Sequence, residues 1–253
     1  MTQTHDDTNI IEQIAILLRA RHDQWESALP AARGCIASLD ARLWMQSPVP
    51  LKDKIYTIEV LQSLAFADAD SGGVDDIANW CLYQLMALLY HSPNDSAILR
   101  DIGQNWLQRA QPYLAAIHIQ YSTSSSSNST RSSTHGLVLT ASEEERLNAA
   151  TMAEAEERLH TSNYVEARGI LVPATEYFSR AVEASQRLGS LSGHLLIEAA
   201  EAFMSLGNVS YSRTNEQYFR RAIHYLRMAT AMPTFNLPAH LQQYLDDYGR
   251  FVD

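Results

Sequence analysis

Apolar residues recur every three or four positions along most of the chain, and this periodicity constrains the fold more than any other feature. It is clear in Ile10, Ile14 and Leu17, and it is clear again in Ile55, Ile58 and Leu61. Such spacing gathers apolar side chains on one face of an α-helix. The only short candidate for a strand is the stretch Gly136 to Thr140. The sequence therefore predicts an all-α protein.

Prolines and glycines mark where the predicted helices begin and end. Pro30 either starts a new helix after a short turn or kinks one that continues. Pro112 suits the first turn of another helix. Pro173 falls inside a long helical pattern, where it should kink the helix or mark a join. Gly207-Asn208 is a typical C-terminal stop. The predicted helices cover about 10–21, 23–44, 51–67, 74–90, 97–110, a stretch from 112, 142–160, 164–188, 195–206, 218–232 and 238–252.

One segment breaks this pattern by its composition. Residues 122–134 read STSSSSNSTRSST, and no core can be built from them. We expect a flexible surface insertion or linker over 122–141, between helical segments 1–121 and 142–253. Its serines are potential phosphorylation sites, although a plain solvated loop explains the same composition.

Small and large residues recur at matching positions in several of these helices. The clearest copy is Cys81, Leu85, Leu88 and Pro93, then Leu99, Gly103 and Trp106. Fainter copies lie at 155–167, at 196–208 and at 219–229, the last reached after an insertion of about ten residues in the turn. This spacing resembles that of the tetratricopeptide repeat over about two-thirds of the chain, in degenerate form.

The resemblance implies an α-solenoid of antiparallel helix pairs, in which each pair buries its face by stacking on its neighbours. Tetratricopeptide domains usually hold peptides or partner proteins in a concave groove lined by the first helix of each pair. Arg100 and Gln104 fall at the groove positions of one such helix, and Ile197 and Glu201 at those of another. Gln104 replaces the Asn with which some members grip a C-terminal carboxylate, so we do not expect chaperone-tail binding.

The charge of the chain narrows its partners. The formal net charge is −10, and the only lysines are Lys52 and Lys54. No basic stripe exists to neutralise phosphates, so we expect no nucleic-acid binding and no attraction to an anionic membrane. An acidic surface favours a protein or peptide partner with basic character.

Motifs for catalysis are missing from the sequence. The nine histidines are scattered without a His-x-x-x-His pair, and no nucleotide-binding or nucleophile-elbow motif occurs. The adjacent acids Asp75-Asp76 stand at a helix start, where they favour the helix dipole. We therefore expect no enzymatic activity, no cofactor and no metal.

Cysteine usage and the N-terminus bear on the compartment. Cys35 and Cys81 are far apart in apolar contexts, which indicates small buried thiols, and the polar, acidic start lacks the features of a secretory signal. We expect a reducing compartment, either the cytoplasm or the nucleus.

The four tryptophans lie at helical spacing in apolar faces, where core packing is the default and contact with a partner peptide is the alternative.

Together these features favour a protein-interaction adaptor or a subunit of a larger assembly, which predicts a contiguous exposed apolar or aromatic patch. The alternative is a small all-α enzyme or small-molecule binder with a dispersed site, which predicts a closed pocket with convergent polar groups. A homodimer that buries one face is also compatible with the sequence.

Overall fold

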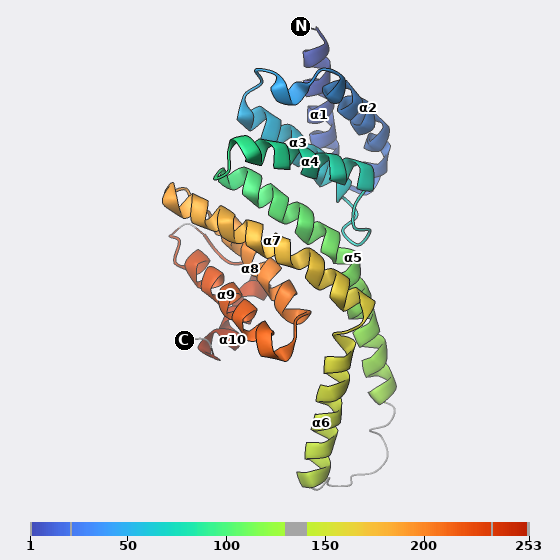
Figure 1. Ribbon diagram of the computed structural model, residues 1–253, viewed down its shortest axis with the longest axis vertical. Coiled ribbons are helices and arrows are strands. Elements are labelled where there is room, and N and C mark those ends of the chain that lie inside the picture. The colour runs from blue at the N-terminus through green and yellow to red at the C-terminus, as the bar shows by residue number, and fades with distance from the viewer. Residues whose placement is uncertain (1, 21, 130–140, 234, 252–253) are drawn as a thin grey trace. The chain divides into compact units, whose positions relative to one another are not determined.

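Helices form every regular element of the computed structural model over the residues that it describes, 2–20, 22–129, 141–233 and 235–251 (Figure 1). The α-helices are α1 (Thr2–Ala20), α2 (Leu29–Ala41), α3 (Leu51–Ala65), α4 (Asp75–His91), α5 (Ser96–Ser129), α6 (Ala141–Arg158), α7 (Ser162–Arg187), α8 (Gly193–Asn208), α9 (Ser212–Thr230) and α10 (Ala239–Tyr248). Short 3-10 helices accompany them: η1 (His22–Ala28), η2 (Trp44–Gln46) and η3 (Gly249–Phe251). The predicted all-α class is confirmed for the described residues.

The chain divides into two compact units. The first comprises Met1–Arg109 together with Glu176–Leu191, and the second comprises Ala110–Thr175 together with Ser192–Asp253. Helices α5 and α7 therefore each contribute residues to both units. These units do not coincide with the segments 1–121, 122–141 and 142–253 that composition suggested.

The first unit contains α1 to α4, the beginning of α5 and the end of α7. Its core collects fully buried side chains from these helices, among them Ile58, Leu61, Ile77, Leu85, Ile102 and Phe178. Pro30 lies in the first turn of α2, where its missing N–H costs no hydrogen bond, so of its two readings the start of a helix is the one observed. A Cβ atom at Gly103 would lie 3.1 Å from the ring of Phe178, so the glycine lets α5 and α7 approach closely.

The second unit includes α8 and α9, which pack along each other. A Cβ atom at Gly207 would lie only 2.7 Å from the ring of Phe219, so this close contact requires glycine. The predicted insertion of about ten residues between the two helices is wrong, because α9 already begins at Ser212. Its first amides bond back to the turn, with the N–H of Thr214 donating to the carbonyl of Tyr211 at 2.8 Å. Polar residues that suggested a loop are exposed positions of this helix.

Two prolines lie inside helices. Pro112 lies within α5, so the prediction that it begins a new helix is wrong. Pro173 lies within α7, which continues through it. Each proline removes one hydrogen bond of the helical backbone. Buried neighbours offset this loss, since Ala110 precedes Pro112, while Leu171 and Ala174 flank Pro173.

The Ser-rich segment is described only in part. Helix α5 extends to Ser129 and thus includes the first serines of that segment, whereas residues 130–140 lie outside the described residues. The strand candidate Gly136 to Thr140 also lies outside them. The flexibility expected of the segment stays a prediction.

Candidate functional site

Arg100 and Gln104 line a groove of about 430 Å³ between α5 and α3 in the first unit. The wall from α5 consists of Arg100, Gln104 and Gln108. The opposite wall consists of Glu59, Gln62 and Ser63 of α3 and of Phe66, which caps the end of that helix. Six of the seven side chains are polar or charged, and three of them carry a primary amide. The two residues predicted from the repeat spacing on this helix therefore do share one concave surface.

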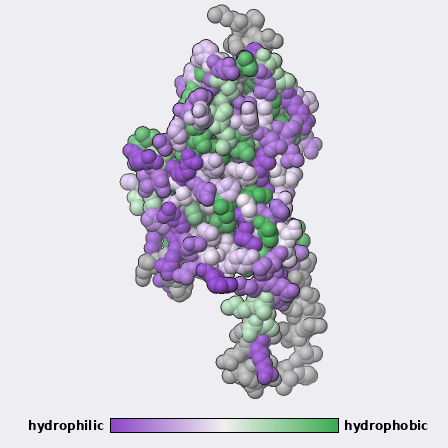
Figure 2. All heavy atoms as spheres, viewed as in Figure 1, coloured by the Kyte–Doolittle hydropathy of each residue, from purple (hydrophilic) through white to green (hydrophobic). Residues whose placement is uncertain are grey.

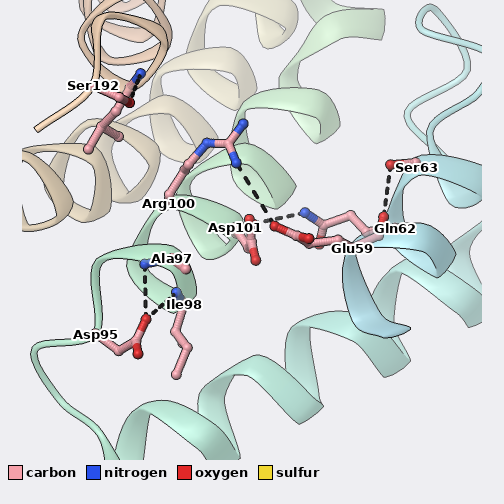
Figure 3. A network of polar contacts seen from close by, with 10 residues as sticks. Glu59, Gln62, Ser63, Asp95, Ala97, Ile98, Arg100, Asp101 and Ser192 are labelled. Carbon is pink, nitrogen blue, oxygen red and sulfur yellow. Dashed lines mark hydrogen bonds and ion pairs between the residues drawn. The ribbon is translucent and has the colours of Figure 1, made fainter. Parts of the chain in front are cut away.

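The start of α5 determines which of its side chains enter the groove. The carboxylate of Asp95 accepts hydrogen bonds from the N–H groups of Ala97 at 3.0 Å and Ile98 at 3.2 Å (Figure 3). These bonds satisfy amides that lack a partner in the first helical turn. Arg100, Gln104 and Gln108 follow at intervals of four residues, which places them on one face.

A charged pair crosses the groove. The guanidinium of Arg100 lies 4.0 Å from the carboxylate of Glu59, and both side chains are about one-third exposed. Figure 3 shows Arg100 extending from α5 toward Glu59 on α3. Water reaches both groups, so this pair contributes little to stability but provides a positive and a negative group to a ligand.

Behind the groove, buried side chains connect α3, α4 and α5. The Nε2 of Gln62 donates to the carbonyl oxygen of Asp101 at 2.9 Å, and Figure 3 shows the two facing each other. The Nδ2 of Asn105 donates to the Oε1 of Gln62 at 2.8 Å and to the carbonyl of Ala78 at 3.2 Å. Asn105 is fully buried and Gln62 nearly so. This network fixes the separation of the two groove walls.

Arg109 extends this network towards α4. Its Nε donates to the Oδ1 of Asn105 and its Nη2 to the Oδ1 of Asn79, both at 2.8 Å. Burial lowers the pKa of Arg109, and Asp75 opposes that shift by its negative charge. Asn105 therefore has both its amide and its carbonyl ends engaged.

Ile197 and Glu201 belong to the second unit. Ile197 is buried, which places it in the core of that unit. Glu201 is partly exposed and lies 3.9 Å from the Nε2 of His240 on α10. Burial raises the pKa of Glu201, and His240 acts in the opposite direction. Of these two predicted residues, only Glu201 presents its side chain to solvent.

A second cavity of the first unit, of about 450 Å³, lies among α1, α2, η2 and α3. Its buried apolar part includes Ile11 and Leu39, and Trp44, Val49 and Tyr56 complete the walls. The sequence drew attention to Trp44 as a residue of an apolar helix face, but Trp44 lies in η2 and is half-buried. Its ring stacks on that of Trp80, with centroids 6.3 Å apart.

Helix α4 exposes an aromatic stripe. Tyr83, Met86 and Tyr90 follow a spacing of three and four and are all exposed, Tyr90 to 85%. The hydroxyl of Tyr177 lies 3.6 Å from the Sδ of Met86. Figure 2 shows hydrophobic and hydrophilic residues intermixed over the face in view, and tyrosine counts as hydrophilic on its scale. These three residues expose large side chains on one face of α4.

The adjacent acids Asp75 and Asp76 have a structural role. Asp75 begins α4, and Asp76 pairs with Arg33 of α2 through oxygens 2.6 and 3.2 Å from its nitrogens. Among the described residues, no group of three or more His, Cys, Asp or Glu side chains is arranged to hold a metal ion. No helix in that part of the chain is long and apolar enough to cross a membrane.

The sequence missed Gln62, Asn105 and Lys54. A buried Asn at an apolar helix position is the signal that could have found Asn105. Lys54 is one of two lysines in the chain, and its position in the apolar face of α3 was visible. Comparison with known proteins adds no further residue, since no protein-family model, curated protein or solved structure matches this chain.

Proposed function

We propose that the protein is an interaction adaptor or a subunit of a larger assembly, which holds an extended segment of a partner protein in the groove between α3 and α5. The observation that carries this proposal is the pair of amide side chains that α5 places in the groove, Gln104 and Gln108, beside the charged pair of Arg100 and Glu59.

Amide side chains suit an extended peptide because a primary amide carries both a donor and an acceptor, as a peptide backbone does. The α3 wall runs from Glu59 to Phe66, which is ~10 Å of helix at ~1.5 Å per residue. About three residues of extended chain span that length. Arg100 and Glu59 add one charge of each sign, which can pair with charged side chains of the segment.

The arrangement of helices in the first unit supports a tetratricopeptide-like solenoid as the finer form of this fold. Helix α3 packs on both α1 and α4. The groove joins α3 to α5 and omits the intervening α4. A concave surface formed by alternate helices is what a stack of helix pairs produces. In the second unit, the closely packed α8 and α9 have the form of such a pair.

The proposal includes a partner of basic character and a reducing compartment, the cytoplasm or the nucleus. The net charge of −10 supports a basic partner, because it would steer a positively charged segment towards the protein. Cys35 and Cys81 support a reducing compartment, because both are free thiols and both are buried. Burial raises the pKa of the Cys35 thiol to about 11, which keeps it protonated and unreactive at neutral pH.

A displayed random dodecapeptide library, selected against the full chain, tests the groove. Enriched peptides are then measured by fluorescence anisotropy against the chain and against two variants of α3. Ser63→Phe fills the groove and should abolish binding. Thr57→Phe, outside the groove lining, is the matched control for the substitution, because both hydroxyls donate to the carbonyl four residues earlier, at 2.8 Å for Ser63 and 2.9 Å for Thr57. Since Thr57 lines the second cavity, a peptide whose binding Thr57→Phe weakens is not counted as a ligand of the groove.

Replacing both Gln104 and Gln108 by Ala should weaken the affinity for the enriched peptides by about tenfold or more, since the peptide backbone loses its amide partners. Circular dichroism establishes that each variant is folded. The proposal fails if no peptide is enriched, or if enriched peptides bind the Ser63→Phe chain as well as the unaltered one.

A further inference from the structure

The cavity among α1, α2, η2 and α3 has a wall that is fixed before any ligand arrives. Lys54 is buried, and its ammonium donates to the carbonyls of Met45 and Ser47, both at 2.9 Å. These two bonds fix the segment that carries Trp44. Leu43, just before it, has a φ of 50°, which is costly for a residue with a branched side chain. A pocket whose wall is held in this way loses little entropy on binding.

The interior of this pocket is apolar and aromatic. Ile11 and Leu39 are almost completely buried, while the rings of Trp44 and Tyr56 and the side chain of Val49 are partly exposed. The volume of about 450 Å³ falls in the usual range of ligand pockets. It has room for one large side chain, and aromatic rings would meet the edges or faces of Trp44 and Tyr56.

The mouth of the pocket is acidic. Glu12 and Asp53 line it from α1 and α3, and the hydroxyl of Tyr56 donates to the Oε2 of Glu12 at 3.0 Å. One guanidinium, that of Arg42, also lines the pocket, but its Nε and Nη2 donate back to the carbonyl and hydroxyl of Ser38, at 3.1 and 2.8 Å. A second guanidinium, that of Arg19 on α1, lies within hydrogen-bonding reach of the Tyr56 hydroxyl but outside the lining. The lining itself therefore holds two carboxylates, of which Glu12 accepts from Tyr56, and one guanidinium that its own helix engages.

From this geometry we infer that the pocket accepts an aromatic side chain of a partner segment whose neighbouring residue is arginine or lysine. The inference rests on the proposed function in one respect only, that the occupant is a protein segment. The pocket is separate from the groove, because it uses α1, α2 and the N-terminal half of α3.

Three capped dipeptides test the inference by fluorine NMR on the full chain labelled with 5-fluorotryptophan. They are N-acetyl-Phe-Arg-amide, N-acetyl-Phe-Glu-amide and N-acetyl-Ser-Arg-amide. The resonance of Trp44 is assigned from the Trp44→Phe variant. We expect Phe-Arg to shift it saturably, with an affinity about tenfold higher than either comparison dipeptide.

Variants separate this pocket from the groove. Thr57→Phe projects into the pocket and should abolish the response to Phe-Arg, whereas Ser63→Phe should leave it unchanged. Should Thr57→Phe not fold, the double variant Glu12→Gln, Asp53→Asn serves in its place. It should bind Phe-Arg and Phe-Glu with equal affinity, because the acidic mouth has been neutralised.

The inference is overturned if Trp44 does not respond, if the three dipeptides bind equally, or if Ser63→Phe removes the response. It is also overturned if free indole binds as tightly as Phe-Arg, because the pocket would then take a small aromatic molecule. The two proposals can fail separately. If Ser63→Phe abolishes dodecapeptide binding but Trp44 responds to no dipeptide, the pocket is refuted and the proposal for the groove stands.

Discussion

Asn105 donates its side-chain amide to the Oε1 of Gln62 at 2.8 Å, and this bond joins α5 to α3 inside the first unit. Gln62 also lines the groove, so one residue belongs both to the binding surface and to the network behind it. A fully satisfied buried network favours one packing of the helices over its alternatives. The width of the groove therefore depends on residues that no ligand would touch.

Replacing Asn105 by Ala should destabilise the first unit by ~2–4 kcal/mol, because Gln62 and Arg109 would each lose a partner in a buried site. Asn79→Ala, at the exposed end of the same network, should cost less than ~1 kcal/mol. Urea unfolding followed by tryptophan fluorescence measures both, since Trp25, Trp44, Trp80 and Trp106 all belong to the first unit. Equal losses in the two variants would refute the role given to Asn105.

Lys54 and Lys52 form a second matched pair. Lys54→Met keeps most of the buried aliphatic chain but leaves the carbonyls of Met45 and Ser47 without their ammonium donor. We expect a loss of ~1–3 kcal/mol by urea unfolding, together with broadening of the Trp44 resonance as its segment is released. Lys52→Met, at an exposed position, should change the free energy of unfolding by less than ~0.5 kcal/mol.

Local patterns sufficed for much of the fold. Apolar periodicity located the helices, whereas Pro30 left a helix start and a kink as alternatives, and the structure has the start. Pro112 and the polar residues after Val209 were misread because a local rule cannot include burial of neighbouring residues. Ala110, two residues before Pro112, is fully buried, and Ala222 and Leu226 are fully buried further along α9. Packing of those residues stabilises helices that sequence alone would interrupt.

The sequence predicted residues of the candidate site only where they lie along one helix. Arg100 and Gln104 are one turn apart, so their spacing revealed them. Gln62 and Asn105 are 43 positions apart, and their bond depends on how α3 and α5 pack. The pocket at Trp44 draws on separate segments, including a 3-10 turn held by Lys54, and no periodic pattern links these.

The ion pair of Arg33 and Asp76 should be visible in the pH dependence of the first unit. The hydrogen bond from Arg33 lowers the pKa of Asp76, against the opposing effect of burial. Because the folded value is depressed, the pair stabilises the fold above the ordinary pKa of Asp, ~3.9, and that stability is lost as the pH falls through the folded value. NMR titration of the Asp76 carboxyl should give a higher pKa in Arg33→Gln, and an unchanged value would contradict the pairing.

Glu201 should show the opposite sign in the second unit. Burial raises its pKa above the ordinary value, so its contribution to stability is greatest below that value and is lost as the pH rises through the folded one. His240→Gln removes the nearby group that lowers this pKa, and should raise it further. Carboxyl NMR titration of both chains measures the change. Glu201→Gln should make the unfolding free energy less dependent on pH over the same range.

Two helical glycines, Gly207 and Gly169, should respond oppositely to a methyl group. Gly207→Ala would bring a Cβ atom to 2.7 Å from the ring of Phe219, so α8 and α9 must separate or the ring must move. We expect a loss of ~1–3 kcal/mol, seen as faster hydrogen exchange of the amides of both helices. Gly169→Ala, inside α7, meets no atom within 4 Å and should stabilise the helix by up to ~1 kcal/mol. If Gly207→Ala were as stable as Gly169→Ala, glycine at 207 would serve only to end α8, and the close approach of the two helices would not depend on it.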